Sequence, residues 1–204
     1  EKLNNFIKDT THELNTPISA ILMSTESNTL NEKQIERIRI SAKRVSELYK
    51  DLTYIFLQNS YDKKSIEIVN LKQIIIDQLE YFQPLAVKKK IDIKLKLEDF
   101  EYKIDKDDFI RIFNNLISNA IKYNKISGTI EIKLEDKSLE ISDSGIGIEQ
   151  NKLKDVFKRY YRATTEQGGF GIGLSIVNQI CNNYNIKISV NSQLKKGSIF
   201  TLTF

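Results

Sequence analysis

The stretch Thr11-His-Glu-Leu-Asn-Thr-Pro17 contains the only histidine of the chain, His12, with Glu13 directly after it. An imidazole with an ordinary pKa of about 6.5 is mostly neutral at pH 7, so it can act as a nucleophile with little activation. A neighbouring carboxylate can orient the ring and accept its proton. Thr16 follows one helical turn later. The stretch predicts a nucleophilic histidine with an acid–base partner; the alternative is an ordinary surface histidine.

Two loops rich in glycine have the composition of a nucleotide-binding site. The first follows Asp143 and contains Gly145 and Gly147. A carboxylate can accept a hydrogen bond from an exocyclic amine, and glycines let a flat ring approach the backbone. The second, Gly168-Gly-Phe-Gly-Ile-Gly-Leu-Ser175, leads into an apolar helix whose free N–H groups suit a phosphate. It matches neither the dinucleotide-binding fingerprint nor the Walker A motif, because it follows a polar loop and lacks Gly-Lys-Ser/Thr.

A polar face is expected on the helix predicted over residues 106–123. Asn115, Asn119 and Lys122 recur at spacings of four and three, opposite an apolar stripe. The amide oxygen of Asn119, together with nucleotide phosphates, suits Mg²⁺. Arg159 and Arg162 are candidates for a phosphate clamp. A polar helix face is usually only solvated. This one indicates a binding site because it occurs together with the Asp143 loop.

Two long helices are expected to position His12. In residues 1 to about 60, apolar side chains recur at spacings of four and three, with a polar break at residues 27–31. His12 falls roughly opposite the apolar seam of the first helix, so we expect its ring to face water. Pro17 predicts a bend one turn later. One narrow stripe on each helix does not close a core, so we expect a second copy to complete a four-helix bundle.

An alternation of strands and helices follows a polar connector near residues 58–64. We expect strands at residues 66–69, 91–97, 129–134, 139–142, 187–191 and 198–204, and helices at residues 71–87, 106–123 and about 171–184. The turn Lys195-Lys-Gly197 predicts a hairpin between the last two strands. The pattern predicts a mixed sheet covered by helices on one face, which is an α/β sandwich.

The composition excludes several classes of protein. The chain has 204 residues, is 40% hydrophobic and carries a net charge of +4, which is too small to indicate nucleic-acid binding. The longest basic run, Lys88 to Lys90, is expected on a solvated helix end. The single cysteine, Cys181, excludes a disulfide framework. Because the only methionine is Met23, we expect a longer natural chain, with any membrane segment upstream.

These motifs resemble those of sensor histidine kinases of bacterial two-component systems, over nearly the whole chain. The stretch from Phe6 to Pro17, which ends in His12-Glu-Leu-Asn-Thr-Pro17, is similar to the phosphoacceptor box of that family. Residues 115–123 resemble the N box, and residues 143–147 resemble the first glycine box. Residues 156–162 resemble the F box, and residues 169–174 resemble the second glycine box. Several boxes in the family's order form a specific signal.

The resemblance implies a fold and an activity. Residues 1–62 are expected to form the dimerisation and histidine phosphotransfer hairpin, and residues 66–204 an ATP-binding domain of the histidine kinase, chaperone and topoisomerase type. ATP and Mg²⁺ are implied, with phosphorylation of His12 and transfer to an aspartate of a response regulator. Also implied are a homodimer through residues 1–60, response-regulator phosphatase activity, and the cytoplasmic portion of an inner-membrane sensor.

The resemblance also implies residue roles. Glu13 would be the acid–base partner of His12, and Thr16 would position water during dephosphorylation. In the second domain Asn119 would ligate Mg²⁺ and Asp143 would bind the adenine amino group. The implied ATP-binding residues are Asn115, Asn119, Lys122, Tyr123, Asp143, Gly145, Gly147, Arg162, Gly169, Gly171, Gly173 and Leu174. Asn15 stands where the family often has arginine and Phe170 where it has threonine, so partner contacts and lid behaviour are expected to differ.

Two other functions remain open on the sequence. An ATP-gated conformational clamp, as in the chaperone and topoisomerase ATPases, would use an acidic residue to activate water, where this chain has Asn115. A degenerate kinase acting as a scaffold is the other. The presence of His12, Asn119 and Asp143 together argues against the scaffold.

Overall fold

The computed structural model describes residues 2–25, 30–57, 65–159, 161 and 171–204, and for His12 and Glu13 it describes only the backbone. The described chain divides into two compact units, Glu1–Asp62 and Lys63–Phe204. The predicted connector at residues 58–64 lies outside the described residues. No helix among the described residues is long and apolar enough to cross a membrane.

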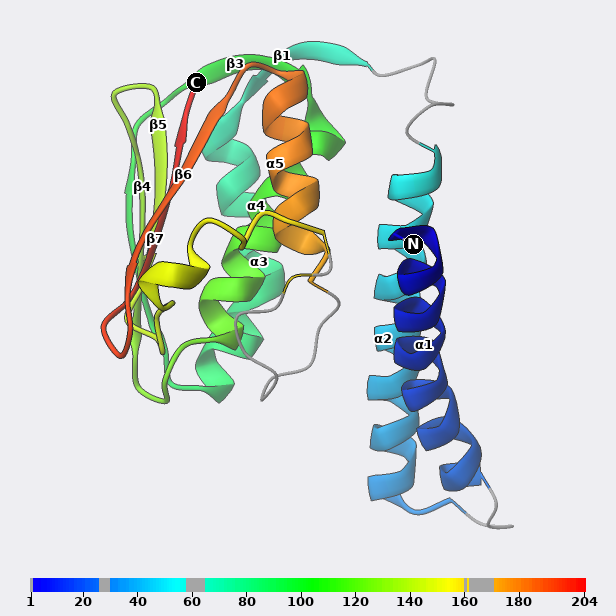
Figure 1. Ribbon diagram of the computed structural model, residues 1–204. Helices are drawn as coiled ribbons and strands as arrows, with labels where there is room; N and C mark the ends of the chain where they lie inside the picture. The colour runs from blue at the N-terminus through cyan, green and yellow to red at the C-terminus, as the bar shows by residue number, and fades with distance from the viewer. Residues whose placement is uncertain (1, 26–29, 58–64, 160, 162–170) are drawn as a thin grey trace. The chain divides into compact units, whose positions relative to one another are not determined.

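The first unit is a helical hairpin of α1 (Lys2–Thr25) and α2 (Glu32–Leu57), which pack side by side (Figure 1). Pro17 is buried, and α1 continues through it to Thr25. The start of α2 is fixed by a reciprocal cap, in which Asn31 Oδ1 accepts the N–H of Gln34 at 3.0 Å and Gln34 Oε1 accepts the N–H of Asn31 at 2.9 Å. The expected pair of long helices is confirmed.

The second unit contains a five-stranded mixed sheet in the order β2-β4-β5-β7-β6. Its strands are β2 (Asp92–Leu97), β4 (Thr129–Glu135), β5 (Ser138–Asp143), β6 (Lys187–Gln193) and β7 (Gly197–Thr203). Only β2 and β4 pair in parallel. The predicted hairpin is confirmed, because Gln193 pairs with Gly197 across a turn in which Lys195 has a φ of 66°.

Three helices cover one face of this sheet: α3 (Leu71–Lys88), α4 (Lys106–Lys122) and α5 (Gly173–Asn183) (Figure 1). A 3-10 helix, η1 (Gln150–Lys152), follows β5. The core forms where the apolar stripe of α4 meets the inward side chains of the strands, because burying these faces removes most of their apolar area from water. Its largest members include Phe109, Ile112, Phe113, Leu116, Ile130, Ile132, Leu134, Leu139 and Leu202.

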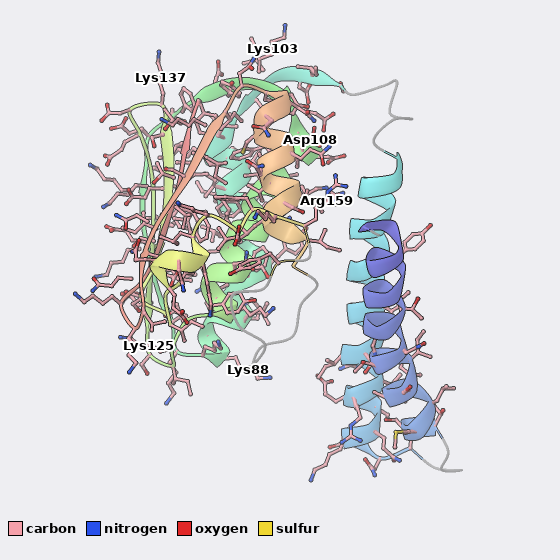
Figure 2. The ribbon with its side chains drawn as sticks, in the orientation of Figure 1. Lys88, Lys103, Asp108, Lys125, Lys137 and Arg159 are labelled. Carbon is pink, nitrogen blue, oxygen red and sulfur yellow. The ribbon has the colours of Figure 1, made fainter. Side chains whose placement is uncertain are left out.

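The start of α4 is held by its own cap and by a neighbouring tyrosine. Asp105 Oδ1 accepts the N–H groups of Asp107 and Asp108 at 3.0 and 3.2 Å. The carboxylate of Asp108, labelled in Figure 2, is buried and accepts the hydroxyl of Tyr184 at 2.8 Å. These bonds fix α4 against the end of α5, so the polar residues further along α4 start from a defined position.

Two sequence expectations were wrong or incomplete. The strand β3 (Glu101–Asp105) was not predicted, and β1 (Ile66–Asn70) pairs with it in a separate two-stranded sheet. Lys88 is exposed at the end of α3, as expected of the basic run, but the ammonium group of Lys89 is hydrogen-bonded to three backbone carbonyls. Both features depend on segments that are distant in sequence.

Candidate functional site

The helical backbone of α1 carries His12 and Glu13 in the same turn, one turn before Thr16. The side chains of Thr11 and Thr16 are exposed, whereas Pro17 is buried. The exposure of the imidazole of His12 remains a prediction. The acid–base role of Glu13 also remains a prediction, because only its backbone is described.

The loop after β5 holds the Asp143 carboxylate close to its own backbone. Asp143 Oδ1 accepts the N–H of Gly145 at 2.8 Å, and the backbone N–H of Ser198 on β7 donates to the same carboxylate. Burial raises the pKa of Asp143 to about 6, and the two backbone hydrogen bonds act in the opposite direction. Asp143 is therefore a largely desolvated carboxyl group whose pKa lies well above that of an exposed aspartate.

Close backbone approach explains the glycines beside Asp143. A Cβ atom at Gly145 would overlap with the carbonyl oxygen of Tyr123 and lie 2.7 Å from Asp143 Oδ1. Gly147, with a φ of 67°, lies against the backbone of Gln193. The loop therefore packs between the end of α4 and the β6–β7 hairpin, and only small residues fit there.

Helix α4 brings the second glycine motif next to Asn115. A Cβ atom at Gly173 would overlap with Asn115 Oδ1, so the start of α5 touches the Asn115 side chain. The amide nitrogen of Asn115 donates to the carbonyl of Arg111 at 2.9 Å. Asn115 and Asn119 are both half-buried on α4. Gly171, with a φ of 65°, precedes α5, and Leu174 lies in its first turn.

The last turn of α4 lies against the Asp143 loop. The carbonyl of Tyr123 accepts the N–H of Ile146 at 3.1 Å. Lys122 Nζ lies 4.8 Å from the centroid of the Tyr123 ring, within the range of a cation–π contact. One helix thus connects the two glycine motifs, with Asn115 at the second and Tyr123 at the first.

Several predicted residues are placed elsewhere or lie outside the described residues. Arg159 donates from Nη2 to Gln179 Oε1 on α5 at 2.8 Å and is exposed (Figure 2). Arg162, Gly169 and the departure at Phe170 lie outside the described part of the chain. The phosphate-clamp role of the two arginines therefore stays a prediction.

A cavity of about 180 Å³ reaches Asp143 from the ends of three strands. Its lining residues are Ser142, Asp143, Asn191, Ser192, Gln193, Lys196, Gly197, Ser198 and Ile199. Ser198 was missed by the sequence reasoning, although its N–H donates to Asp143. Its only signal would have been the strand register that pairs Asp143 with Ser198.

Neither a thiol nor a cluster of metal ligands adds chemistry to the described part of the chain. Cys181 is buried, and burial raises the pKa of its thiol to about 12, so the thiolate is scarce at neutral pH. Among the described residues no group of three or more His, Cys, Asp or Glu side chains could hold a metal ion. A magnesium ion here would depend on an amide such as Asn119 together with nucleotide phosphates, which fits the preference of Mg²⁺ for few protein ligands.

Two sequence families match the chain in the order of its two units. The His Kinase A (phospho-acceptor) domain matches residues 2–56, and the Histidine kinase-, DNA gyrase B-, and HSP90-like ATPase matches residues 104–204. The chain therefore belongs to the sensor histidine kinases, the histidine protein kinases of two-component signal transduction, and carries their ATP-binding domain. The predicted fold class, a helical hairpin followed by an α/β ATPase-type domain, is confirmed.

Individual relatives agree with this assignment. The histidine protein kinase SaeS of Staphylococcus aureus (strain USA300) is 28% identical over 227 residues, covering 100% of this chain and 64% of the relative. The chain thus spans less than two thirds of the length of that relative. Among solved structures, the Acinetobacter baumannii histidine kinase AdeS has a TM-score of 0.73 at 24% identity, covering 94% of this chain and 95% of that one.

A further solved structure contains a partner protein. The histidine kinase ThkA, solved in complex with the response regulator protein TrrA, has a TM-score of 0.70 at 21% identity. The match covers 98% of this chain and 60% of that one. At these identities AdeS and ThkA support the fold alone.

Proposed function

We propose that the chain is an ATP-dependent histidine autokinase that phosphorylates His12 and passes the phosphoryl group to an aspartate of a response regulator. The observation that best supports this proposal is the position of α4. Asn115 on this helix lies beside Gly173, and Tyr123 at its end lies beside the Asp143 loop. A nucleotide bound along this helix would have its base near Asp143 and its phosphates near the start of α5. The family match of residues 2–56 supplies the phosphoacceptor domain that contains His12.

The side chains of the second unit suit distinct parts of ATP. The Asp143 carboxylate accepts a hydrogen bond from the exocyclic amine of adenine. Lys122 and the amide of Asn115 bind phosphate oxygens, and Tyr123 lies against the nucleotide. Asn119 would hold Mg²⁺, and its amide is half-buried on the same helix. The metal, when bound, neutralises charge that develops on the phosphates.

The first unit supplies the nucleophile. A ring nitrogen of His12 forms a bond to the γ-phosphorus while the bond from that phosphorus to the β–γ bridging oxygen breaks and ADP leaves. Glu13 orients the ring and accepts its proton. In the second reaction a carboxylate oxygen of the response regulator takes the phosphoryl group from the imidazole. Thr16, which is exposed on α1, would position water when the regulator is dephosphorylated.

A homodimer through residues 1–60 is part of the proposal. Large apolar side chains of the hairpin are exposed in the single chain, among them Ile18, Leu22, Met23, Leu30, Ile35 and Ile40. A second hairpin would cover them and complete a four-helix bundle. ThkA, whose fold this chain shares, was solved with the response regulator TrrA, and we propose a response regulator as the second partner of this chain. We further propose that the chain is the cytoplasmic portion of a longer inner-membrane sensor; its coverage of 64% of SaeS supports the greater length alone.

Incubation with γ-labelled ATP and Mg²⁺ tests the proposal. The chain should become labelled, and the label should be acid-labile and base-stable, because a phosphorus–nitrogen bond hydrolyses readily once protonated. The response regulator should then remove the label. Steady release of inorganic phosphate from a chain that never carries label would instead favour the ATP-gated clamp and reject the kinase.

The affinity for ADP should fall as the pH falls through about 6. The carboxyl of Asp143 has its pKa raised to about 6 in the free protein, and an amine donor stabilises only the ionised form. Bound nucleotide therefore lowers the pKa of Asp143. At a pH below the pKa of the free protein, protonation of the carboxylate competes with nucleotide binding. Between about pH 7.5 and pH 5 the dissociation constant should rise about tenfold through this group.

The Asp143→Asn variant is the matched control for this pH dependence. Its amide keeps the shape of the side chain and an acceptor oxygen but does not titrate in this range. The phosphates of ADP titrate equally with both proteins, so the difference between the two calorimetric pH profiles isolates Asp143. If the ADP affinity of the variant and that of the original chain depend on pH in the same way, Asp143 is not the group that binds the adenine amine.

A further inference from the structure

The ammonium group of Lys89 closes the C-terminal end of α4. Lys89 lies in the turn between α3 and β2, and its Nζ donates to the carbonyls of Ile121, Lys122 and Asn124 at 3.0, 2.7 and 3.2 Å. An ammonium group has three donors, and here each has an acceptor. The last carbonyls of a helix lack partners within the helix and carry partial negative charge, so a cation is well suited to this position.

Burial makes this contact different from an ordinary surface lysine. Lys89 is half-buried, and desolvation lowers its pKa, whereas Lys88 and Lys90 on either side are exposed. The backbone of this turn is held as well, because the carbonyl of Lys89 accepts the N–H of Ser127 at 2.9 Å. Hydrogen bonds from a charged donor are stronger than those between neutral groups, and three of them join this turn to the end of α4.

The same end of α4 is tied to the Asp143 loop through Asn124, which is buried. Asn124 Oδ1 accepts the hydroxyl of Ser144 at 3.2 Å, and its Nδ2 donates to the carbonyl of Thr129 at 3.0 Å. Ser144 is the residue directly after Asp143. The hydrogen bonds thus run from Lys89 through the last turn of α4 to the loop that carries the carboxylate.

We propose that Lys89 is a positioning residue for nucleotide binding: by gathering the terminal carbonyls of α4 it sets Lys122 and Tyr123 relative to the Asp143 loop. This inference rests on the proposed function, because it assigns the nucleotide to these residues. Lys89 itself does not touch the nucleotide. The basic run at residues 88–90 therefore contains one internal hydrogen-bonding lysine between two solvated ones.

The Lys89→Met variant of the full chain tests this role, because methionine keeps much of the apolar stem and removes the ammonium. The dissociation constant of ADP, measured by calorimetry well below the unfolding temperature, should rise at least about fivefold. Lys88→Met and Lys125→Met, each at an exposed position labelled in Figure 2, remove the same charge and should change the affinity less than about twofold.

Thermal unfolding of the same variants separates positioning from simple stability. A lower unfolding temperature for Lys89→Met with an unchanged ADP affinity would overturn the proposal. If Lys89→Met does not fold, Lys89→Gln is measured instead, because its shorter, neutral amide can serve at most two of the three carbonyls; an affinity equal to that of the original chain would show that the ammonium is not required and would again overturn the proposal. Failure of the original chain to bind ADP would reject the proposed function, and the role of Lys89 with it.

Discussion

A chain with the His12→Gln substitution should take up no detectable phosphoryl label from ATP. Glutamine has a planar amide of similar reach, but its nitrogen lone pair is delocalised into the carbonyl, so it is not a nucleophile. No other histidine is present to replace it. We expect the loss to exceed about a thousandfold, because the attacking atom itself is removed. Label is quantified after separation of the protein from free nucleotide.

The same variant should bind ADP as the original chain does, within about twofold. His12 lies in the compact unit Glu1–Asp62, whereas Asn119 and Asp143 lie in the unit Lys63–Phe204. Ser19→Ala, at an exposed position further along α1, is the control for helix integrity and should retain label. Substantial acid-labile label on the His12→Gln protein would reject His12 as the phosphoacceptor, and loss of ADP binding would mean that the substitution disturbs the fold.

Replacing Gly197 by alanine should destabilise the ATPase unit more than any surface substitution. Gly197 has a φ of 113°, which an L side chain rarely adopts, and a Cβ atom there would overlap with the carbonyl oxygen of Asp143. The atoms that this Cβ would meet belong to the backbone of Asp143 and Ser144, which cannot move aside as a flexible side chain can. Strands β5 and β7 would therefore have to separate. We expect the free energy of unfolding to fall by about 3 kcal/mol or more, a large part of the total for a domain of this size.

Urea unfolding of Gly197→Ala and Thr203→Ala measures this difference. Thr203 lies exposed on the same strand, so its replacement removes β-propensity alone and should cost less than about 1 kcal/mol. Because the carbonyl that clashes belongs to Asp143, the glycine variant should also bind ADP more weakly while still folded. A loss of stability below about 0.5 kcal/mol for Gly197→Ala would contradict the strand geometry described above.

Local pattern was sufficient for most elements of the fold. The apolar stripe of α4 predicted a helix over residues 106–123, and the structure has Lys106–Lys122. The turn Lys195-Lys-Gly197 predicted the β6–β7 hairpin, because turn residues act over a few positions. Strand β3 was missed because its partner, β1, lies more than thirty residues earlier, and a five-residue strand with three charged residues has little local signal.

By itself the sequence determined which residue types are available for chemistry: one imidazole beside a carboxylate, two glycine motifs, and amides spaced along one helix. Only the tertiary structure decided which of them meet. It placed Asn115 against Gly173 and Tyr123 against Gly145. It also distinguished Lys89 from the lysines on either side, because only Lys89 donates hydrogen bonds to the end of α4 and the turn after it. Hydrogen bonding and close approach act between atoms brought together by packing, and a linear pattern does not encode which distant carbonyl a side chain will reach.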